Sequence, residues 1–258
     1  MLYDVNGSVV AAGGSGDVNP LEGKKICLIG DSNTQYSGTA FKEYFENTYG
    51  CLFTPLGYAG ATWENGDGVT HEYSAVARVN ALISGADEDT KLCTDYDIVL
   101  IMMGTNCTAA GTVTDTSETL TTMCGAARYC LEKLLYYYRK SKIGVILPPQ
   151  RADGNADQES RNMLLKSICD EFSVTTCDLY HSGQIVPNAS TPDGDNYYLN
   201  DGLHFGANGI IQFERTVGGW LASGMPGTAS GTSLGLTGAA VGQIAKISAV
   251  DEDGKPTA

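Results

Sequence analysis

The sequence predicts a three-layer α/β/α sandwich around a central, mostly parallel, five-stranded sheet. Between residues 21 and 221, short apolar runs alternate with stretches in which apolar residues recur every three or four positions. This alternation is typical of βαβ units. The runs are nearly continuous in their hydrophobicity, and parallel strands that are covered by helices on both faces have this character.

The predicted strands are the five apolar runs. The first, residues 25–29, reads Lys-Ile-Cys-Leu-Ile, and the central one, residues 98–103, reads Ile-Val-Leu-Ile-Met-Met. Short apolar runs of this kind fit fully buried strands. The remaining strands are expected at residues 51–58, 143–147 and 174–178.

Helices are predicted between these strands from apolar residues at helical spacing. The strongest pattern runs from residue 120 to 138, and Asp115 with Glu118 resembles a capping box at its start. Weaker patterns predict helices around residues 41–45, 164–172 and 210–221. We interpret these apolar stripes as core.

The length of 258 residues predicts one main domain. We assign residues 21–222 to it. Residues 1–20 are expected to form an N-terminal arm, irregular or extended on the domain, because residues 9–16 are small and rich in glycine. Residues 223–258 are expected to form a linker rich in Gly, Ser and Thr and a small β appendage, because residues 241–250 alternate in polarity.

The charge disfavours two classes of partner. Lys and Arg number 16 against 30 Asp and Glu, and the net charge of -14 repels nucleic acid and anionic membranes. No apolar run approaches the ~20 residues of a membrane span. Residues 1–20 also lack the basic start and apolar stretch of a secretory signal peptide. We therefore expect a soluble protein that is cytoplasmic as synthesised.

The eight cysteines lack C-x-x-C spacing and mostly fall within apolar patterns. This favours buried free thiols and a reducing compartment over disulfides. No ligand pairs stand at the short spacing of a zinc site, so no metal is expected.

Two separated motifs suggest nucleophilic catalysis. Gly30-Asp31-Ser32 follows the first strand, where a serine is held at the end of a rigid element. Asp201-Gly-Leu-His204 places a carboxylate at the spacing that lets it orient an imidazole, and an imidazole can deprotonate a serine. Taken alone, Gly-Asp-Ser also fits an ordinary turn.

The other two histidines are interpreted as surface or structural residues. His71 is expected on a loop or helix start, and His181 follows a strand end. We expect neither to have a carboxylate in the Asp-X-X-His arrangement that His204 has. His204 is therefore the expected base.

Two further loops could supply hydrogen-bond donors. Gly60 follows the second strand, where the lack of a side chain lets a backbone N–H approach a developing oxyanion. Gly104-Thr105-Asn106 follows the central strand, and the Asn106 amide could donate to the same oxygen. The alternatives are a loop glycine and a capping or turn-forming asparagine.

The order Gly-Asp-Ser, Gly, Gly-X-Asn and Asp-X-X-His resembles the SGNH (GDSL-type) hydrolase family over residues 21–221. The resemblance implies a flavodoxin-like sheet and a serine esterase without a cofactor. Ser32 would be the nucleophile, His204 the general base and acid, and Asp201 the group that orients His204. The N–H groups of Ser32 and Gly60 and the Asn106 side chain would form the oxyanion hole.

The sequence departs from the family pattern at two places. Leucine is missing after the nucleophile, where the block reads Gly-Asp-Ser-Asn-Thr, and Cys107 stands where many relatives have Asp. Neither change removes a catalytic group. We expect a different anchoring of the Asn106 loop.

The substrate is less visible in the sequence. Trp63, Tyr197 and Tyr198 could present flat surfaces to a sugar, and Thr105 is also a candidate substrate contact; the alternative is that these side chains pack the loops. Gln150 or Arg151, at the end of the fourth strand, could also reach substrate. With no obvious apolar lid, a short acyl ester such as an O-acetyl group on carbohydrate is favoured over the lipase or thioesterase alternatives.

A second hypothesis comes from the tail. Residues 241–258 are similar to C-terminal segments of phage or prophage structural proteins. The protein would then be a structural or glycan-binding module that modifies or only binds a surface receptor. The tail would mediate homo-oligomer formation or association with a particle.

Overall fold

The computed structural model describes residues 19–66, 72–85, 95–152, 157–187 and 198–226, and the backbone of strands β1 (Leu2–Tyr3) and β2 (Val9–Val10). Contacts divide the chain into two units, Met1–Thr228 and Ala229–Ala258. The tail, His71, Cys93 and Tyr197 lie outside the described residues. β1 and β2 pair antiparallel, so the N-terminal arm contains regular structure that the sequence analysis did not predict.

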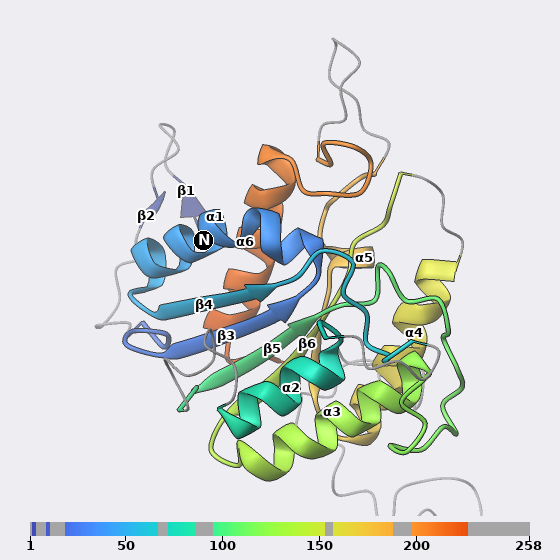
Figure 1. The fold of residues 1–258 in the computed structure, drawn as a ribbon. Helices are drawn as coiled ribbons and strands as arrows, with labels where there is room; N and C mark the ends of the chain where they lie inside the picture. The colour runs from blue at the N-terminus through green and yellow to red at the C-terminus, as the bar shows by residue number, and fades with distance from the viewer. Residues whose placement is uncertain are drawn as a thin grey trace, which may run out of the picture. The chain divides into compact units, whose positions relative to one another are not determined.

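The central sheet has five parallel strands in the order β4-β3-β5-β6-β7 (Figure 1). This confirms the predicted sheet. The chain starts inside the sheet at β3, crosses to the edge at β4, and returns to β5 on the other side of β3. Ligands in such sheets bind at the carboxyl ends of the strands where the order reverses, here β3 and β5. The strands are β3 (Lys25–Gly30), β4 (Leu52–Gly57), β5 (Ile98–Met102), β6 (Lys142–Leu147) and β7 (Thr175–Asp178).

Side chains alternate between two hydrophobic cores along each strand, as the pleat requires. In β3, Ile26 and Leu28 join one core, whereas Cys27 and Ile29 join the other. Because both faces are buried, the strand reads as a continuous apolar run.

Helices cover both faces of the sheet, which confirms the predicted three layers (Figure 1). α1 (Ser32–Tyr49) and α6 (Ala207–Ala222) pack over the core that contains Ile26. The other face carries α2 (Ala75–Ser84), α3 (Met123–Tyr137) and α4 (Asp157–Glu171), and the single turn α5 (Leu179–Ser182) follows β7. None of the helices in the described ranges is long and apolar enough to cross a bilayer.

Two helix starts differ from expectation. α2 was not predicted, although Ser74 caps it by accepting a hydrogen bond from the Ala77 N–H. α3 begins at Met123 instead of residue 120, and its cap is Thr122, whose hydroxyl also donates to Asp115 at 2.6 Å. The predicted capping box is therefore wrong: Asp115 supports the capping threonine and does not start the helix.

A glycine holds helix α1 close to the edge strand β4. At Gly57, the last residue of β4, a Cβ atom would lie 2.1 Å from the backbone nitrogen of Gln35 in α1. Only glycine permits this approach. The first turn of α1 is thereby fixed against the sheet.

The described cysteines are buried thiols that form no disulfide within the described residues, as predicted; Cys93 lies outside the described ranges. Burial raises the pKa of Cys51 and of Cys124 to about 11. These thiols are therefore protonated near neutral pH and unsuited to nucleophilic attack.

Candidate active site

Ser32 is the first residue of α1, directly beyond the carboxyl end of β3. The preceding residue, Asp31, caps the helix by accepting a hydrogen bond from the Asn33 N–H at 3.0 Å. Burial of this carboxyl raises its pKa to about 6, although bonds from the Asn33 N–H and Thr105 and the nearby His204 act in the opposite direction. Asp31 thus shapes the turn that presents Ser32.

His204 and Asp201 lie on a tight loop between Leu199 and Phe205, which form an antiparallel bridge. Gly202 has a φ of +79°, a left-handed conformation that favours glycine. One Asp201 oxygen, Oδ1, accepts the backbone N–H of Leu203 at 2.9 Å and of His204 at 2.7 Å. The loop therefore folds around the carboxylate.

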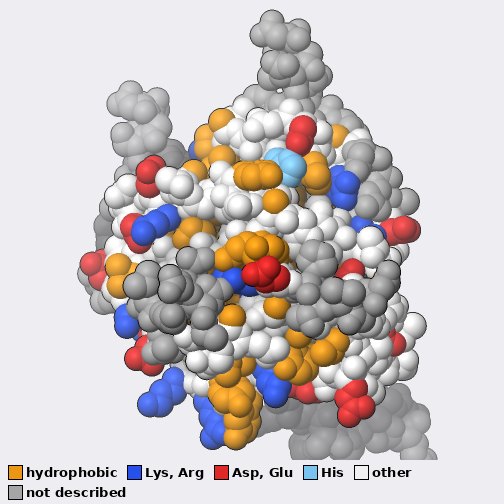
Figure 2. Space-filling model, viewed as in Figure 1, with side chains coloured by type: hydrophobic (Ala, Val, Ile, Leu, Met, Phe, Trp, Pro, Cys, Tyr) orange, Lys and Arg blue, Asp and Glu red, His pale blue; other side chains and the backbone are white. Residues whose placement is uncertain are grey.

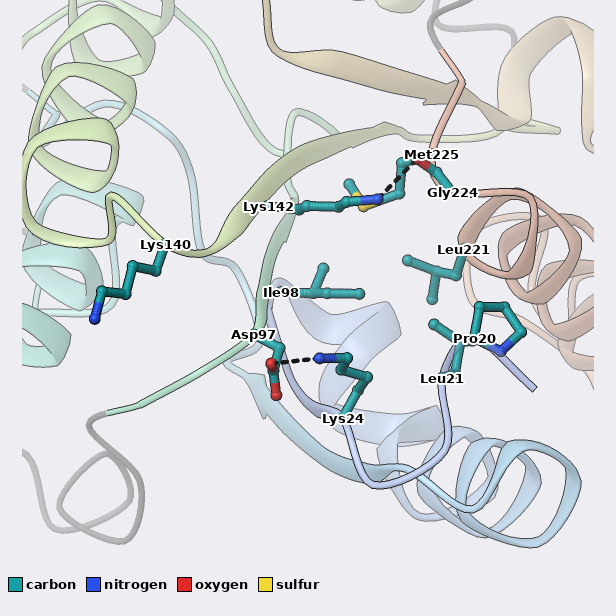
Figure 3. Close-up of a pocket in the computed structure, with 10 residues that line it drawn as sticks. All are labelled: Pro20, Leu21, Lys24, Asp97, Ile98, Lys140, Lys142, Leu221, Gly224 and Met225. Atoms are coloured by element: carbon teal, nitrogen blue, oxygen red, sulfur yellow. Dashed lines mark hydrogen bonds and ion pairs between the residues drawn. The ribbon is translucent and has the colours of Figure 1, made fainter. Parts of the chain in front are cut away.

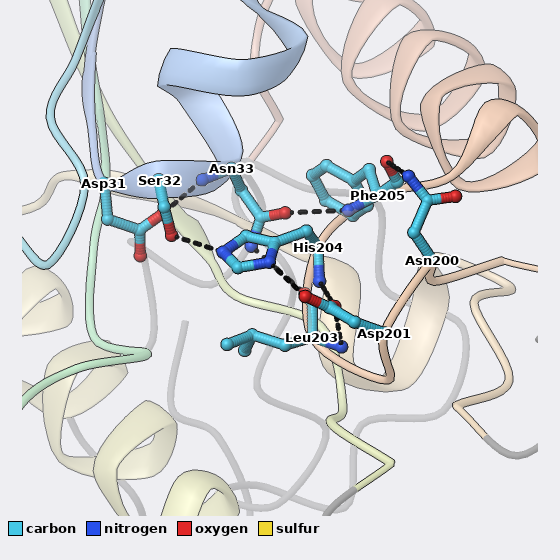
Figure 4. A network of polar contacts seen from close by, with 8 residues as sticks. All are labelled: Asp31, Ser32, Asn33, Asn200, Asp201, Leu203, His204 and Phe205. Carbon is cyan, nitrogen blue, oxygen red and sulfur yellow. Dashed lines mark hydrogen bonds and ion pairs between the residues drawn. The ribbon is translucent and has the colours of Figure 1, made fainter.

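The structure aligns these groups with Ser32 (Figure 4). His204 Nδ1 lies 2.6 Å from Asp201 Oδ2, and His204 Nε2 lies 3.0 Å from Ser32 Oγ. Burial acts to raise the pKa of Asp201, but the hydrogen bonds from His204 and Leu203 outweigh it and lower the pKa to about 2. A charged carboxylate, an imidazole and a serine hydroxyl in line can transfer a proton away from the serine.

Contrary to expectation, the Asp-X-X-His spacing does not set His204 apart from His181. The same spacing occurs in Asp178-Leu-Tyr-His181, where His181 Nδ1 lies 2.8 Å from Asp178 Oδ2. The hydrogen bond with Asp178 raises the pKa of His181, and Glu159, 3.4 Å from Nε2, adds to this effect. His204 differs because its second nitrogen faces Ser32.

Of the three predicted oxyanion donors, Ser32 begins α1, whereas Gly60 and Asn106 lie in the loops that follow β4 and β5. Gly60 has a φ of +76°, and neither its N–H nor that of Ser32 has a hydrogen-bond partner in the described part of the chain. The Asn106 amide donates one hydrogen to the Ala61 carbonyl oxygen at 3.1 Å. A primary amide has two N–H donors, so the second remains for a ligand.

The Gly60 and Asn106 loops are tied together around the unusual Cys107. Glu64, which is buried, accepts the Thr108 N–H at 2.9 Å, and Cys107 Sγ accepts the Trp63 N–H at 3.4 Å. Burial and the Glu64 carboxylate raise the pKa of the Cys107 thiol. Cys107 and Glu64 thus anchor the Asn106 loop from the Gly60 side.

The candidate substrate contacts are mostly packed. Trp63 is fully buried and donates its Nε1 hydrogen to the Met103 carbonyl, so it is a core residue and not a substrate surface. Thr105 is also buried, which favours its packing alternative, and its carbonyl accepts from Arg151 at 2.9 Å. Tyr198 is half-buried against the core. Gln150 is similarly engaged, since its amide donates to the Tyr180 carbonyl at 3.3 Å.

Sequence reasoning missed Tyr36, an exposed aromatic residue at the site. It lies one turn after Ser32 on α1, its ring centroid is 5.0 Å from that of His204, and 64% of it is accessible. Its position in the sequence could have indicated this, because Tyr36 is four residues after Ser32 and residues four apart lie on the same face of a helix.

A cavity of about 160 Å³ lies elsewhere, by the amino ends of β3 and β5 (Figure 3). Lys24 bonds Asp97 and Lys142 donates to the Gly224 carbonyl, so two of its three lysines are already engaged. Ser32, Asp201 and His204 are not among the residues that line it. No cluster of His, Cys, Asp and Glu suited to a metal occurs among the residues with described positions.

The fold is shared with solved structures of low sequence identity. A Lactobacillus plantarum protein is 18% identical with a TM-score of 0.63, over 78% of this chain and 98% of its own. An acetylxylan esterase from Geobacillus stearothermophilus is 16% identical with a TM-score of 0.52, over 81% and 98%. A carbohydrate acetylesterase from Sinorhizobium meliloti is 18% identical with a TM-score of 0.52, over 78% and 99%.

These likenesses define the class as three-layer α/β/α proteins with a parallel five-stranded sheet. The family follows from the sequence itself: the model of the GDSL-like Lipase/Acylhydrolase family matches residues 28–209, and the chain belongs to that family. No curated protein matches the chain.

Proposed function

We propose that this protein is a serine esterase that removes a short acyl group, in particular an O-acetyl group, from a carbohydrate. The observation that carries the proposal is the continuous line from Asp201 through His204 to Ser32, with contacts of 2.6 and 3.0 Å. Such an arrangement makes a hydroxyl nucleophilic at neutral pH.

In the first half of the reaction, Ser32 Oγ attacks the ester carbonyl carbon and its proton passes to His204 Nε2. Asp201 stabilises the resulting imidazolium. The carbonyl oxygen becomes an oxyanion that accepts hydrogen bonds from the Ser32 and Gly60 N–H groups and from Asn106. The bond between the carbonyl carbon and the alcohol oxygen then breaks, and His204 protonates that oxygen. The acyl group stays on Ser32 Oγ as an acyl-enzyme.

In the second half, a water molecule attacks the acyl carbon while His204 accepts its proton. Collapse of the second tetrahedral intermediate breaks the bond to Ser32 Oγ, which takes the proton back from His204. The acid is released and the resting state is restored.

The preference for an acetylated sugar has two supports. Two similar structures are an acetylxylan esterase and a carbohydrate acetylesterase. Tyr36 adds an exposed ring beside His204, and a flat amphipathic ring suits the face of a sugar. On the face shown in Figure 2, acidic and basic side chains are interspersed, with hydrophobic side chains between them.

The test compares aryl esters of increasing acyl length with acetylated xylo-oligosaccharides, using Ser32→Ala as the blank. Turnover should be highest for acetyl esters and absent in Ser32→Ala. A sharp preference for long acyl chains would favour the lipase alternative and refute the short-acyl proposal. Full turnover by Ser32→Ala would refute the serine mechanism.

A further inference from the structure

The residue after the nucleophile joins the helix of Ser32 to the loop of His204. Asn33 Oδ1 accepts the backbone N–H of Phe205 at 2.9 Å, and Asn33 Nδ2 donates to the Leu203 carbonyl oxygen at 3.4 Å (Figure 4). Its two partners are the neighbours of His204 in the chain. One side chain therefore holds the backbone on both sides of the expected base.

We infer that Asn33 is a positioning residue that sets the distance between His204 Nε2 and Ser32 Oγ, an inference that rests on the proposed function. Asn33 and Ser32 are consecutive in the first turn of α1, so their relative position is fixed by the helix. The clamp transmits this fixed position to the His204 backbone. Asp201 fixes the orientation of the imidazole from within the loop, whereas Asn33 fixes the loop relative to the nucleophile.

The surroundings of Asn33 make this clamp stiff. Its side chain is almost completely buried, with 2% of the residue accessible. Water cannot readily replace a hydrogen bond lost in such a place, so loss of the amide would leave the Phe205 N–H without its partner. The loop would then shift or open, although Asp201 would continue to hold His204 within it.

The expected effect on the reaction follows from geometry. Proton transfer needs the 3.0 Å contact between His204 and Ser32, and a displacement of about 1 Å can cost on the order of 10²-fold in rate. Ground-state binding depends less on this contact. Loss of the clamp should therefore lower kcat and leave KM nearly unchanged.

Asn19 offers a matched control at the opposite end of the sheet. Its amide also joins two backbone groups, donating to the Tyr49 carbonyl at 2.7 Å and accepting the Leu21 N–H at 3.1 Å. Asn33→Ala and Asn19→Ala should both lower Tm. Only Asn33→Ala should lower kcat on an aryl acetate, by about 10²-fold.

A double-mutant cycle separates positioning from general damage. In a His204→Ala background, residual turnover has no base to position, so Asn33→Ala should cause no further loss. An equal loss in both backgrounds would overturn the inference, as would a kcat for Asn33→Ala equal to that of Asn19→Ala.

Two further comparisons separate failure of the positioning role from misfolding of the variant and from failure of the proposed function. If Asn33→Ala does not fold, Asn33→Ser replaces it, because its hydroxyl is too short to span both backbone groups. Activity that survives Ser32→Ala would refute the proposed function itself. An inactive Ser32→Ala beside a fully active Asn33 variant would refute only the positioning role.

Discussion

Replacing Asp201 by asparagine tests the proposed triad without dismantling its loop. In Asp201→Asn the side-chain oxygen can still accept the N–H groups of Leu203 and His204, which bond Oδ1 at 2.9 and 2.7 Å. The new amide cannot accept the hydrogen of His204 Nδ1, and it donates to that nitrogen instead. The imidazole proton then sits on Nε2 and faces Ser32, so the base is lost.

The magnitude follows from the exposure of the carboxylate. For a buried aspartate in such a triad, the same change lowers kcat about 10⁴-fold. The Asp201 side chain is 55% accessible, so water shares in stabilising the imidazolium. We therefore expect a smaller loss, on the order of 10²- to 10³-fold in kcat. Because the pKa of Asp201 is about 2, the effect should be present throughout the neutral range.

The second Asp-X-X-His pair supplies the control. Asp178→Asn alters the same kind of contact, 2.8 Å from His181 Nδ1, at a place with no facing serine. Stopped assays with an aryl acetate should show unchanged kcat in Asp178→Asn. A kcat for Asp201→Asn above about a tenth of the wild-type value, or an equal loss in both variants, would refute the role of Asp201 in the triad.

Three other perturbations have defined outcomes. Asn106→Ala should lower kcat about 10²- to 10³-fold with little change in KM, and steady-state kinetics that show full turnover would remove this residue from the oxyanion hole. Asp31→Asn should stabilise the fold above pH 6. The buried carboxyl has a pKa of about 6 against 3.8 ordinarily, so its ionised form costs on the order of 3 kcal/mol there and nothing below both pKa values. Denaturant unfolding at pH 4.5 and 8 should show the larger gain at pH 8, and an equal gain at both would contradict the cause. Tyr36→Ala should raise KM for acetylated xylo-oligosaccharides about fivefold, as expected for about 1 kcal/mol of ring contact, and leave KM for a small aryl acetate unchanged; equal effects on both substrates would exclude a carrier contact.

Much of the fold was predictable because local pattern and tertiary burial agree. The three inner strands β3, β5 and β6 are apolar runs buried on both faces, whereas the edge strands β4 and β7 are only partly buried. The order of the strands along the chain placed Ser32 and Asn106 at the carboxyl edge. α2 was missed because its ten residues follow a polar loop and offer only a short apolar stripe. The start of α3 was misjudged because Asp115 bonds a threonine side chain, a contact that spacing does not reveal.

The candidate catalytic residues could be predicted from the sequence, but the tertiary contacts that position them could not. Ser32, Asp201 and His204 stood in motifs, yet the Asp-X-X-His spacing also occurs at His181, and only the tertiary structure brings one pair to a serine. Trp63 could not be judged from its position beside Gly60, because its burial depends on residues 40 and more positions away.

The ties between the active-site loops run from side chains to backbone groups. Asn33 holds the backbone at Phe205, Glu64 that at Thr108, Asn106 that at Ala61 and Arg151 that at Thr105. A backbone amide is present whatever side chain its residue carries. Of the receiving positions, Thr108 is exposed and can therefore be exchanged while the bond to Glu64 is kept, whereas Ala61, Thr105 and Phe205 are buried. In an engineering campaign, exposed positions on these loops, such as Thr108, are the places to vary for a new acyl carrier, and the side chains of Asn33, Glu64, Asn106 and Arg151 are the ones to leave alone.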